Sequence, residues 1–199
     1  MEIKVDAMGQ PCPQPVIRAK KTIEAMTEPG SVQVLVDNEV ATSNLAKLAV
    51  QKNLESTTIK LDENQYSVTI KVTKEAIGME QECDEVLQKN LVVVLSSDKM
   101  GDGDPELGTL LMKGFVYAIS QLDELPKTIL LYNAGAKLSV DGSDLLEDLK
   151  NLEEAGVEIL TCGTCLSHYG LSDRLAVGSV TNMYIIAEKM AGAATIMRP

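Results

Sequence analysis

The chain has 199 residues, of which 45% are hydrophobic, and its formal net charge is −11. This apolar content is enough for a buried core, and no run approaches the roughly 18 continuous apolar residues that a membrane-spanning helix needs. The acidic charge argues against general nucleic-acid binding, and one Phe, five Tyr and no Trp provide no stacking platform for single-stranded nucleic acid.

The first part of the chain alternates between strand and helix patterns. We expect strands at 3–7 and 31–37, helices at 13–26 and 38–53, and a hairpin at 56–73 that turns at 62–65. The apolar positions expected to face the core are Val16, Ile17, Ile23 and Met26 in the first helix and Val40, Leu45, Leu48 and Ala49 in the second. The order β-α-β-α-β-β predicts a two-layer α/β sandwich over residues 1–73.

Residues 74–89 are acidic and only weakly periodic, which predicts a linker and a domain boundary. Beyond it, strands are expected at 90–95, 126–135, 157–161 and 194–199, and helices at 105–122, 142–156 and 179–193. Alternating strands and helices indicate an open, mostly parallel α/β sheet over residues 90–199. Nearly all of the negative net charge falls in residues 74–199, which also indicates two units with different surfaces.

The four cysteines are too sparse for a disulfide-stapled secreted domain, and the first residues lack the apolar run of a signal peptide. We therefore expect a cytoplasmic protein whose thiols stay reduced. Cys12 lies among prolines between the first strand and the first helix, where Pro13 suits the first helical turn. At that position the helix N-terminus stabilises a thiolate, and Gly9 lets the chain turn while the prolines stiffen it. The alternative is a cysteine that only packs as a small apolar side chain.

Residues 1–73 resemble the TusA/SirA family of small sulfur-carrier proteins. The resemblance is carried by Asp6, Gly9, the motif Cys12-Pro13-x-Pro15 and the basic pair Lys20-Lys21. It implies that Cys12 accepts a sulfur atom as a persulfide and passes it to another protein's thiol, without a metal or other cofactor. Such chemistry requires an exposed thiolate that can attack and later leave.

A second cysteine pair, Cys162 and Cys165, follows the strand at 157–161, at the strand end where sites in open α/β sheets are built. Three interpretations remain open. Both thiols and His168 could bind zinc, although a fourth ligand is missing. The CGTC sequence could act as a redox dithiol, although it follows the third strand of its unit and has no proline nearby. The pair could also accept a persulfide, with one thiol resolving or releasing the sulfur.

Residues 90–199 resemble DsrE/DsrF-like domains. In this sequence, Cys162 is the position that best matches the reactive cysteine of those domains. The fused order resembles YedF-type proteins, described as sulfurtransferase-like and linked to selenium metabolism. This resemblance implies a homo-oligomer built through residues 90–199. It also implies that the loop at 96–108 shapes the second site, whereas the residues alone indicate a capped helix start there.

Other candidate residues have supporting roles. His168 is expected to donate a proton or hold a thiolate, or else to be an ordinary loop histidine. Cys83 lies among acidic residues that discourage thiolate formation, so we treat it as a bystander. Arg18, Lys20 and Lys21 form a basic group that could dock an acidic partner or simply be a solvated helix face.

Together these observations predict a sulfur or selenium relay through Cys12, Cys162 and Cys165, supported by Asp6, Gly9, Pro13, Pro15 and His168. Its expected partners are a protein sulfur donor resembling a cysteine desulfurase and a protein thiol acceptor, with no membrane. Two alternatives remain: an oligomeric regulatory or docking module without transfer activity, and a dithiol oxidoreductase that uses CGTC.

Overall fold

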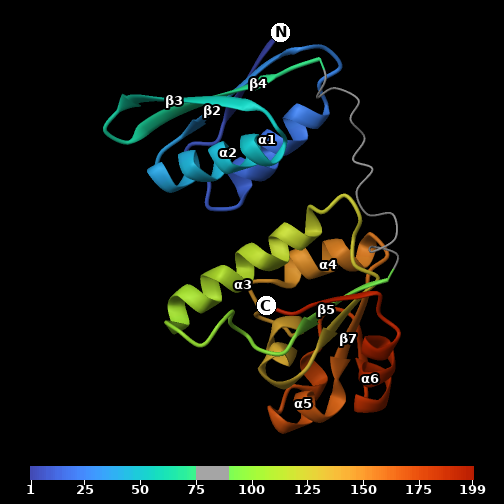
Figure 1. Cartoon of the computed structure of the whole chain (residues 1–199). Coiled ribbons are helices and arrows are strands. Elements are labelled where there is room, and N and C mark those ends of the chain that lie inside the picture. The colour runs from blue at the N-terminus through green and yellow to red at the C-terminus, as the bar shows by residue number, and fades with distance from the viewer. Residues whose placement is uncertain (75–89) are drawn as a thin grey trace. The chain divides into compact units, whose positions relative to one another are not determined.

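The computed structural model describes residues 1–74 and 90–199. The chain forms two compact units, one before and one after residues 75–89 in the sequence, which we call the N-terminal and C-terminal units (Figure 1). The predicted linker and Cys83 therefore lie outside the described residues. In the described part no helix is long and apolar enough to cross a bilayer.

The N-terminal unit is the predicted two-layer sandwich. Its elements are β1 (Glu2–Asp6), α1 (Gln14–Glu24), β2 (Gly30–Val36), α2 (Glu39–Gln51), β3 (Glu55–Asp62) and β4 (Gln65–Val72). The sheet has the order β1-β2-β4-β3, in which β1 and β2 are parallel and the other pairs are antiparallel. Both helices cover one face of this sheet (Figure 1). The core lies between them because alternate residues of β2 and β4 point to the helices.

Some of the helix residues that face the core differ from those predicted from the apolar pattern. In α1 the buried positions are Pro15, Ala19 and Ile23, whereas Val16 and Ile17 are only partly buried. Val40 was expected in the core, but its side chain is 67% exposed. The buried stripe of α2 starts one residue later, at Ala41, because one residue rotates a helical side chain by about 100°. Ala41 then aligns with the other predicted core residues of α2, all of which are buried.

The C-terminal unit has a five-stranded parallel sheet. Its strands are β5 (Leu91–Leu95), β6 (Thr128–Leu131), β7 (Glu158–Cys162), β8 (Ser179–Thr181) and β9 (Thr195–Met197), in the order β8-β7-β6-β5-β9. Its helices are α3 (Pro105–Ser120), α4 (Leu146–Glu154), α5 (Gly163–His168) and α6 (Met183–Ala191), with short 3-10 helices η1 (Asn133–Ser139) and η2 (Ser172–Arg174). The predicted mostly parallel α/β fold is thus confirmed.

Helices cover both faces of the parallel sheet. One core cluster joins α3 and α4 to alternate residues of β5 and β6, such as Val93 and Ile129. A second cluster joins α6 to the opposite side of the same strands, including Val94 and Leu130. The central strands β5 and β6 are therefore buried along their whole length, as is typical of parallel sheets. Three elements were missed: the start of the predicted helix at 179–193 is the short strand β8, η1 begins within the predicted strand at 126–135, and η2 lies where no element was expected.

Candidate functional site

The loop between β1 and α1 presents Cys12 and is held at both of its turns. Asp6 ends β1, and its Oδ1 accepts the Met8 N–H at 3.0 Å. Gly9 has a φ of +70°, a conformation that favours glycine, and its N–H donates to Oδ2 of Asp37 at 3.0 Å. Asp6 and Gly9, both singled out from the sequence, therefore fix the path of the chain towards the cysteine.

The prolines after this turn shape the start of α1. Pro13 is the N-cap residue, joined to Cys12 by a cis peptide bond, and Pro15 is buried in the first turn. Pro13 was expected to lie inside the first turn of the helix, but the helix begins one residue later, so Pro13 is its N-cap. The Gln14 N–H donates to the Pro11 carbonyl at 3.0 Å, and the Val16 N–H donates to the Pro13 carbonyl at 3.1 Å. These N–H groups at the start of α1 already have acceptors, so they are not the donors to the thiol that the sequence suggested.

The hydrogen bond to Cys12 comes instead from the second helix. Cys12 is exposed, and its Sγ accepts from Nδ2 of Asn44, with an N···S distance of 3.9 Å. Sequence reasoning missed Asn44 because it is 32 residues away and only the packing of α1 against α2 brings it to the cysteine. Among the described residues, this amide N–H is the hydrogen-bond donor that the structure gives to the Cys12 sulfur.

A hollow of about 30 Å³ lies beside Cys12, enough for one or two water-sized groups. Its lining is mostly amide and small apolar groups: Gln10, Cys12, Pro15, Val16, Asn38, Val40, Ala41 and Asn44. The Oε1 atom of Gln10 is buried there without a hydrogen-bond partner among the described residues. Val40, which is exposed and not in the core, is therefore one of the side chains that line this hollow.

We expect replacement of Asn44 by alanine to slow alkylation of Cys12 about fivefold at neutral pH, because one hydrogen bond to the thiolate, worth about 1 kcal/mol, is lost. The rate is measured by peptide mass spectrometry during reaction with iodoacetamide. Ser43→Ala is the matched control, since Ser43 is an exposed neighbour on the same helix. Equal alkylation rates in the two variants would show that Asn44 does not assist the thiolate.

The basic group on α1 consists of Arg18, Lys20 and Lys21, of which Arg18 holds the helix to β1. The Arg18 guanidinium donates to the Asp6 carbonyl oxygen, so it ties α1 to the end of β1. Lys20 forms an ion pair with Glu24 at 3.8 Å, and Lys21 is exposed in the last part of the helix.

The second cysteine pair lies at the carboxyl ends of the parallel strands, as predicted. Cys162 ends β7 and is the N-cap residue of α5, and its side chain is only 2% exposed because it packs in the core with Leu130 and Ile186. Cys165 is half-buried one turn later, and its Sγ accepts the backbone N–H of Asn133 at 3.0 Å. The two thiols therefore have unequal access to solvent.

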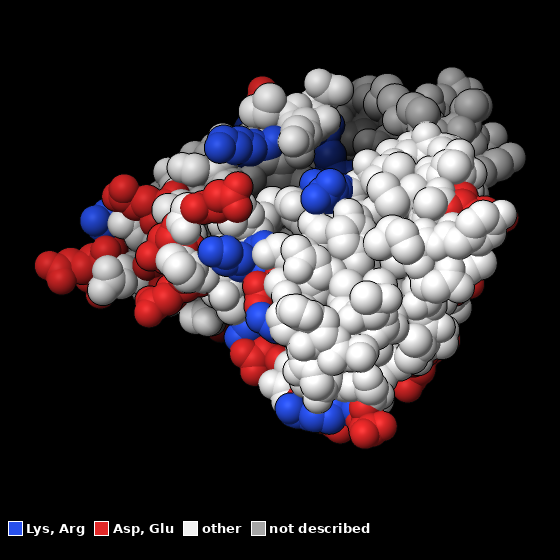
Figure 2. Space-filling view, turned by 90° about the horizontal axis from the view of Figure 1, so that it is seen from below, with Lys and Arg blue, Asp and Glu red and all other residues white. Residues whose placement is uncertain are grey.

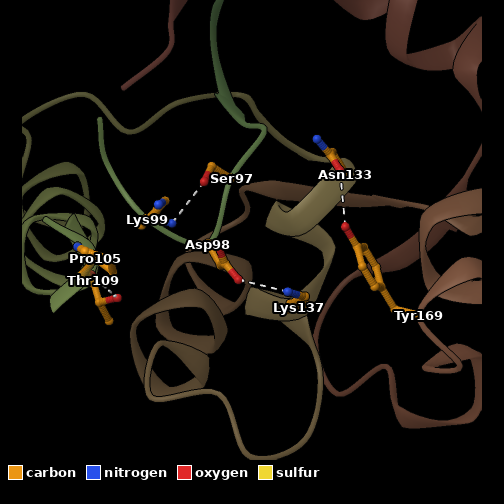
Figure 3. Close-up of polar contacts among 8 residues, drawn as sticks. All are labelled: Ser97, Asp98, Lys99, Pro105, Thr109, Asn133, Lys137 and Tyr169. Atoms are coloured by element: carbon orange, nitrogen blue, oxygen red, sulfur yellow. Dashed lines mark hydrogen bonds and ion pairs between the residues drawn. The ribbon is translucent and has the colours of Figure 1, made fainter. Parts of the chain in front are cut away.

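Figure 3 shows the polar contacts that hold the Asn133 side of this site. The Tyr169 hydroxyl donates to Oδ1 of Asn133 at 3.2 Å, and Lys137 Nζ lies 4.8 Å from the centre of the Tyr169 ring. Lys137 also pairs with Asp98 at 3.1 Å, which connects the loop after β5 to η1. We call Cys162, Cys165, Asn133 and Tyr169 the second thiol site. Asn133 and Tyr169 carry no sequence signal, because only the parallel sheet brings their segments together.

The environment of Cys165 affects its ionisation in both directions. Burial raises the pKa of its thiol above the ordinary value, the Asn133 N–H lowers that pKa, and the neighbouring Cys162 thiol raises it as a hydrogen-bonding and charged partner. The net pKa is raised.

His168 ends α5 and is exposed, and its ring meets the Tyr169 ring edge to face at 5.0 Å between centroids. In residues 1–74 and 90–199, no three His, Cys, Asp or Glu side chains gather in a metal-binding arrangement. The loop at 96–108 begins α3 as the capped start expected from the residues: Oδ1 of Asp104 accepts the Leu107 N–H at 2.8 Å. The same loop also supplies Asp98, whose carboxylate pairs with Lys137 of η1 beside the second thiol site.

An open groove of about 690 Å³ lies at the other end of the parallel sheet, away from the thiols. Glu158 at its side accepts hydrogen bonds from Lys189 and from the Thr128 hydroxyl. Burial raises the pKa of Glu158, but Lys189 and Thr128 outweigh it and hold that pKa below its usual range. The groove contains no cysteine, so its size does not mark the site of thiol chemistry.

Comparisons with known proteins give one family match and several similar solved structures. The family described as Sulfurtransferase TusA matches residues 3–72. A SirA-like protein from Desulfitobacterium hafniense is 41% identical, with 37% of this chain and 100% of that chain covered and a TM-score of 0.35. The ychN protein from E. coli is 19% identical, with 55% and 98% covered and a TM-score of 0.42. A protein of unknown function from Methanobacterium thermoautotrophicum is 21% identical, with 55% and 98% covered and a TM-score of 0.41. Comparison with curated proteins gives no match.

The N-terminal unit is thus a two-layer α/β sandwich that exposes a cysteine thiol on a braced, proline-rich loop. The family match places this thiol in a TusA/SirA-like sulfurtransferase domain over residues 3–72. TusA-type proteins exchange sulfur with protein partners. The resemblance of residues 90–199 to DsrE-like domains, and of the whole chain to YedF-type proteins, stays a prediction.

Proposed function

We propose that the chain carries sulfane sulfur as a persulfide on Cys12 and passes it between protein thiols. The observation that carries this proposal is the exposed Cys12 sulfur, held on the β1–α1 loop of a TusA-family unit and hydrogen-bonded by Asn44. Asp6, Gly9, Pro13 and Pro15 position the thiol, and the reaction uses no metal or other cofactor. A reducing cytoplasm keeps such thiols available.

The transfer is a displacement at sulfur. The Cys12 thiolate attacks the outer sulfur of a donor persulfide, the donor's S–S bond breaks, and the donor leaves as a thiolate. Cys12 then holds the transferred sulfur in a new S–S bond, and no electrons are gained or lost overall. Delivery to an acceptor thiol is the same step with Cys12 as the leaving group.

We also propose that the C-terminal unit takes part in the relay through Cys162 and Cys165, with His168 as a supporting residue. The proposed domains are residues 1–73 and 90–199, joined by the linker 74–89, which raises the effective concentration of one thiol site near the other. The same chemistry transfers selenium, so the mass of the adduct distinguishes the two cargoes.

The proposal is tested by incubating the intact protein with a cysteine desulfurase and cysteine, followed by peptide mapping. An addition of about 32 Da on the peptide that contains Cys12 is the expected result. Absence of this addition, in a sample whose desulfurase loads a control acceptor, would contradict the carrier function. It would favour a docking module without transfer activity.

We propose that the side of α1 that bears Lys20 and Lys21 docks the acidic surface of a sulfur donor. We expect Lys20→Glu combined with Lys21→Glu to slow loading by the desulfurase about tenfold at low salt, because attraction between opposite charges speeds association. Loading by a small-molecule persulfide should not change. The matched control is Lys4→Glu with Lys71→Glu, which makes the same charge change on the open face of the sheet. Equal slowing in both double variants would remove the docking role.

We propose that the protein self-associates through its C-terminal unit. Figure 2 shows a broad surface without charged side chains over this unit. Exposed apolar side chains also occur on β8 and α6, where Val180 and Met183 are each 58% exposed and Tyr184 is 74% exposed. Large exposed apolar areas are typical of interaction surfaces.

A further inference from the structure

The two thiols of the second thiol site differ in what can reach them. Cys162 is enclosed by the core, and the start of α5 is packed tightly against β8, since a Cβ on Gly163 would lie 2.8 Å from the Val180 side chain. Cys165 is half-buried and contacts η1 through its sulfur. An incoming sulfur donor therefore meets Cys165 first.

A backbone donor is fixed at the Cys165 sulfur. The Asn133 N–H that donates to it belongs to a residue with a φ of +51°, a conformation that asparagine adopts more readily than most residues. The Tyr169 hydroxyl holds the side chain of the same residue. Although burial raises the pKa of Cys165, this N–H stabilises the thiolate at the moment when it attacks.

The thiols are also close enough to react with each other. Cys162 is the N-cap of α5 and Cys165 lies three residues later, a spacing that puts two side chains on the same side of the first helical turn. Cys165 packs against the core cluster that contains Cys162, and the Cys162 thiol is near enough to help raise the pKa of Cys165. Residues with this spacing fall within the Cα separation that a disulfide requires.

We propose that the C-terminal unit reduces sulfane sulfur to sulfide, with Cys165 as the acceptor and Cys162 as the resolving thiol. The inference rests on the proposed function for the supply of persulfide. In this reaction Cys165 is the cysteine that accepts sulfur, whereas the sequence pattern gave that role to Cys162.

The reaction has two balanced steps. The Cys165 thiolate attacks the outer sulfur of a donor persulfide, whose S–S bond breaks to release the donor thiolate. The Cys162 thiolate then attacks Sγ of Cys165, the bond between this sulfur and the outer sulfur breaks, and hydrosulfide leaves. The outer sulfur is reduced, and the two thiols are oxidised to a disulfide. A dithiol reductant returns the pair to its starting state by thiol–disulfide exchange.

The test uses the full chain with Cys83→Ser, reacted anaerobically with one equivalent of glutathione persulfide. Sulfide is measured against a protein-free sample, and each cysteine peptide is mapped after alkylation. We expect about one sulfide per chain and a Cys162–Cys165 disulfide that leaves the peptide about 2 Da lighter. A sample without persulfide controls for other oxidants.

Single replacements separate the two roles. Cys162→Ala should keep an addition of about 32 Da on Cys165 and release no sulfide, whereas Cys165→Ala should show neither an adduct on Cys162 nor a disulfide. Cys162→Ser, which keeps the side-chain size, should behave as Cys162→Ala does. An adduct on Cys162 in the Cys165→Ala protein, or a lasting persulfide on the intact pair, would overturn the proposal. The Cys12 peptide of the same samples reports separately on the carrier function.

Discussion

Replacing Cys12 by serine is expected to reduce sulfane-sulfur loading of the N-terminal unit to background, a loss of about 100-fold or more. A serine hydroxyl is not ionised at neutral pH, so the nucleophile that attacks the donor persulfide disappears. The loop itself should keep its path, because the hydrogen bonds that hold its turns come from Asp6, Asp37 and the backbone, and within residues 1–74 and 90–199 only the bond from Asn44 reaches the Cys12 sulfur. Loading is measured by the mass of the peptide that contains residue 12.

Cys83→Ser is the matched control, because it makes the same chemical change at a thiol to which we assign no role. It should load Cys12 at the wild-type rate. If the Cys12→Ser protein still delivered sulfur to an acceptor as fast as the wild type, Cys12 would not be the carrier. If both serine variants lost loading, the effect would not be specific to Cys12.

Replacing Gly135 by alanine is expected to destabilise the C-terminal unit by about 3 kcal/mol or more, a fall in Tm of roughly 10 °C or more. A Cβ at this buried position would lie 1.9 Å from the Leu95 carbonyl oxygen. This atom belongs to the backbone of a central strand, so it cannot move aside as the end of a flexible side chain can. The end of β5 and η1 would have to separate. Calorimetry of the full chain measures the change.

Gly103→Ala provides the comparison, because a Cβ there meets nothing within 4 Å. It should leave the Tm of the C-terminal unit within about 1 °C of the wild type. The transition of the N-terminal unit should be unchanged in both variants. Similar stability of the two variants would mean that β5 and η1 do not approach each other as closely as the structure indicates.

The sequence predicted the architecture well because both sheets have simple patterns. The continuous apolar run of β5 indicates burial on both faces, and the structure buries every residue of that strand. The strand-to-helix turn at Cys12 was also predictable, since Gly9 and the prolines restrict the backbone locally. Residues that act through such local geometry can be recognised without knowledge of the fold.

The contacts to the two sulfur sites could not be predicted in the same way. Asn44 and Asn133 each reach a thiol across 32 residues, and neither lies in a motif. The unequal burial of Cys162 and Cys165 also depends on which strand and helix pack over each thiol. Val40 shows the limit of a helical pattern, because an error of one residue moves a side chain from the core to the rim of the Cys12 hollow.

The position of β9 beside β5 has a consequence for the order in which the two units form during synthesis. All the strands of the N-terminal unit are complete by Val72, so this unit can fold while the ribosome is still making the rest. In the C-terminal unit the first strand pairs with the last, and Val93 finds its partner Met197 only after more than a hundred further residues. Until then one edge of β5 stays open, and a nascent chain exposes it to other unfinished chains.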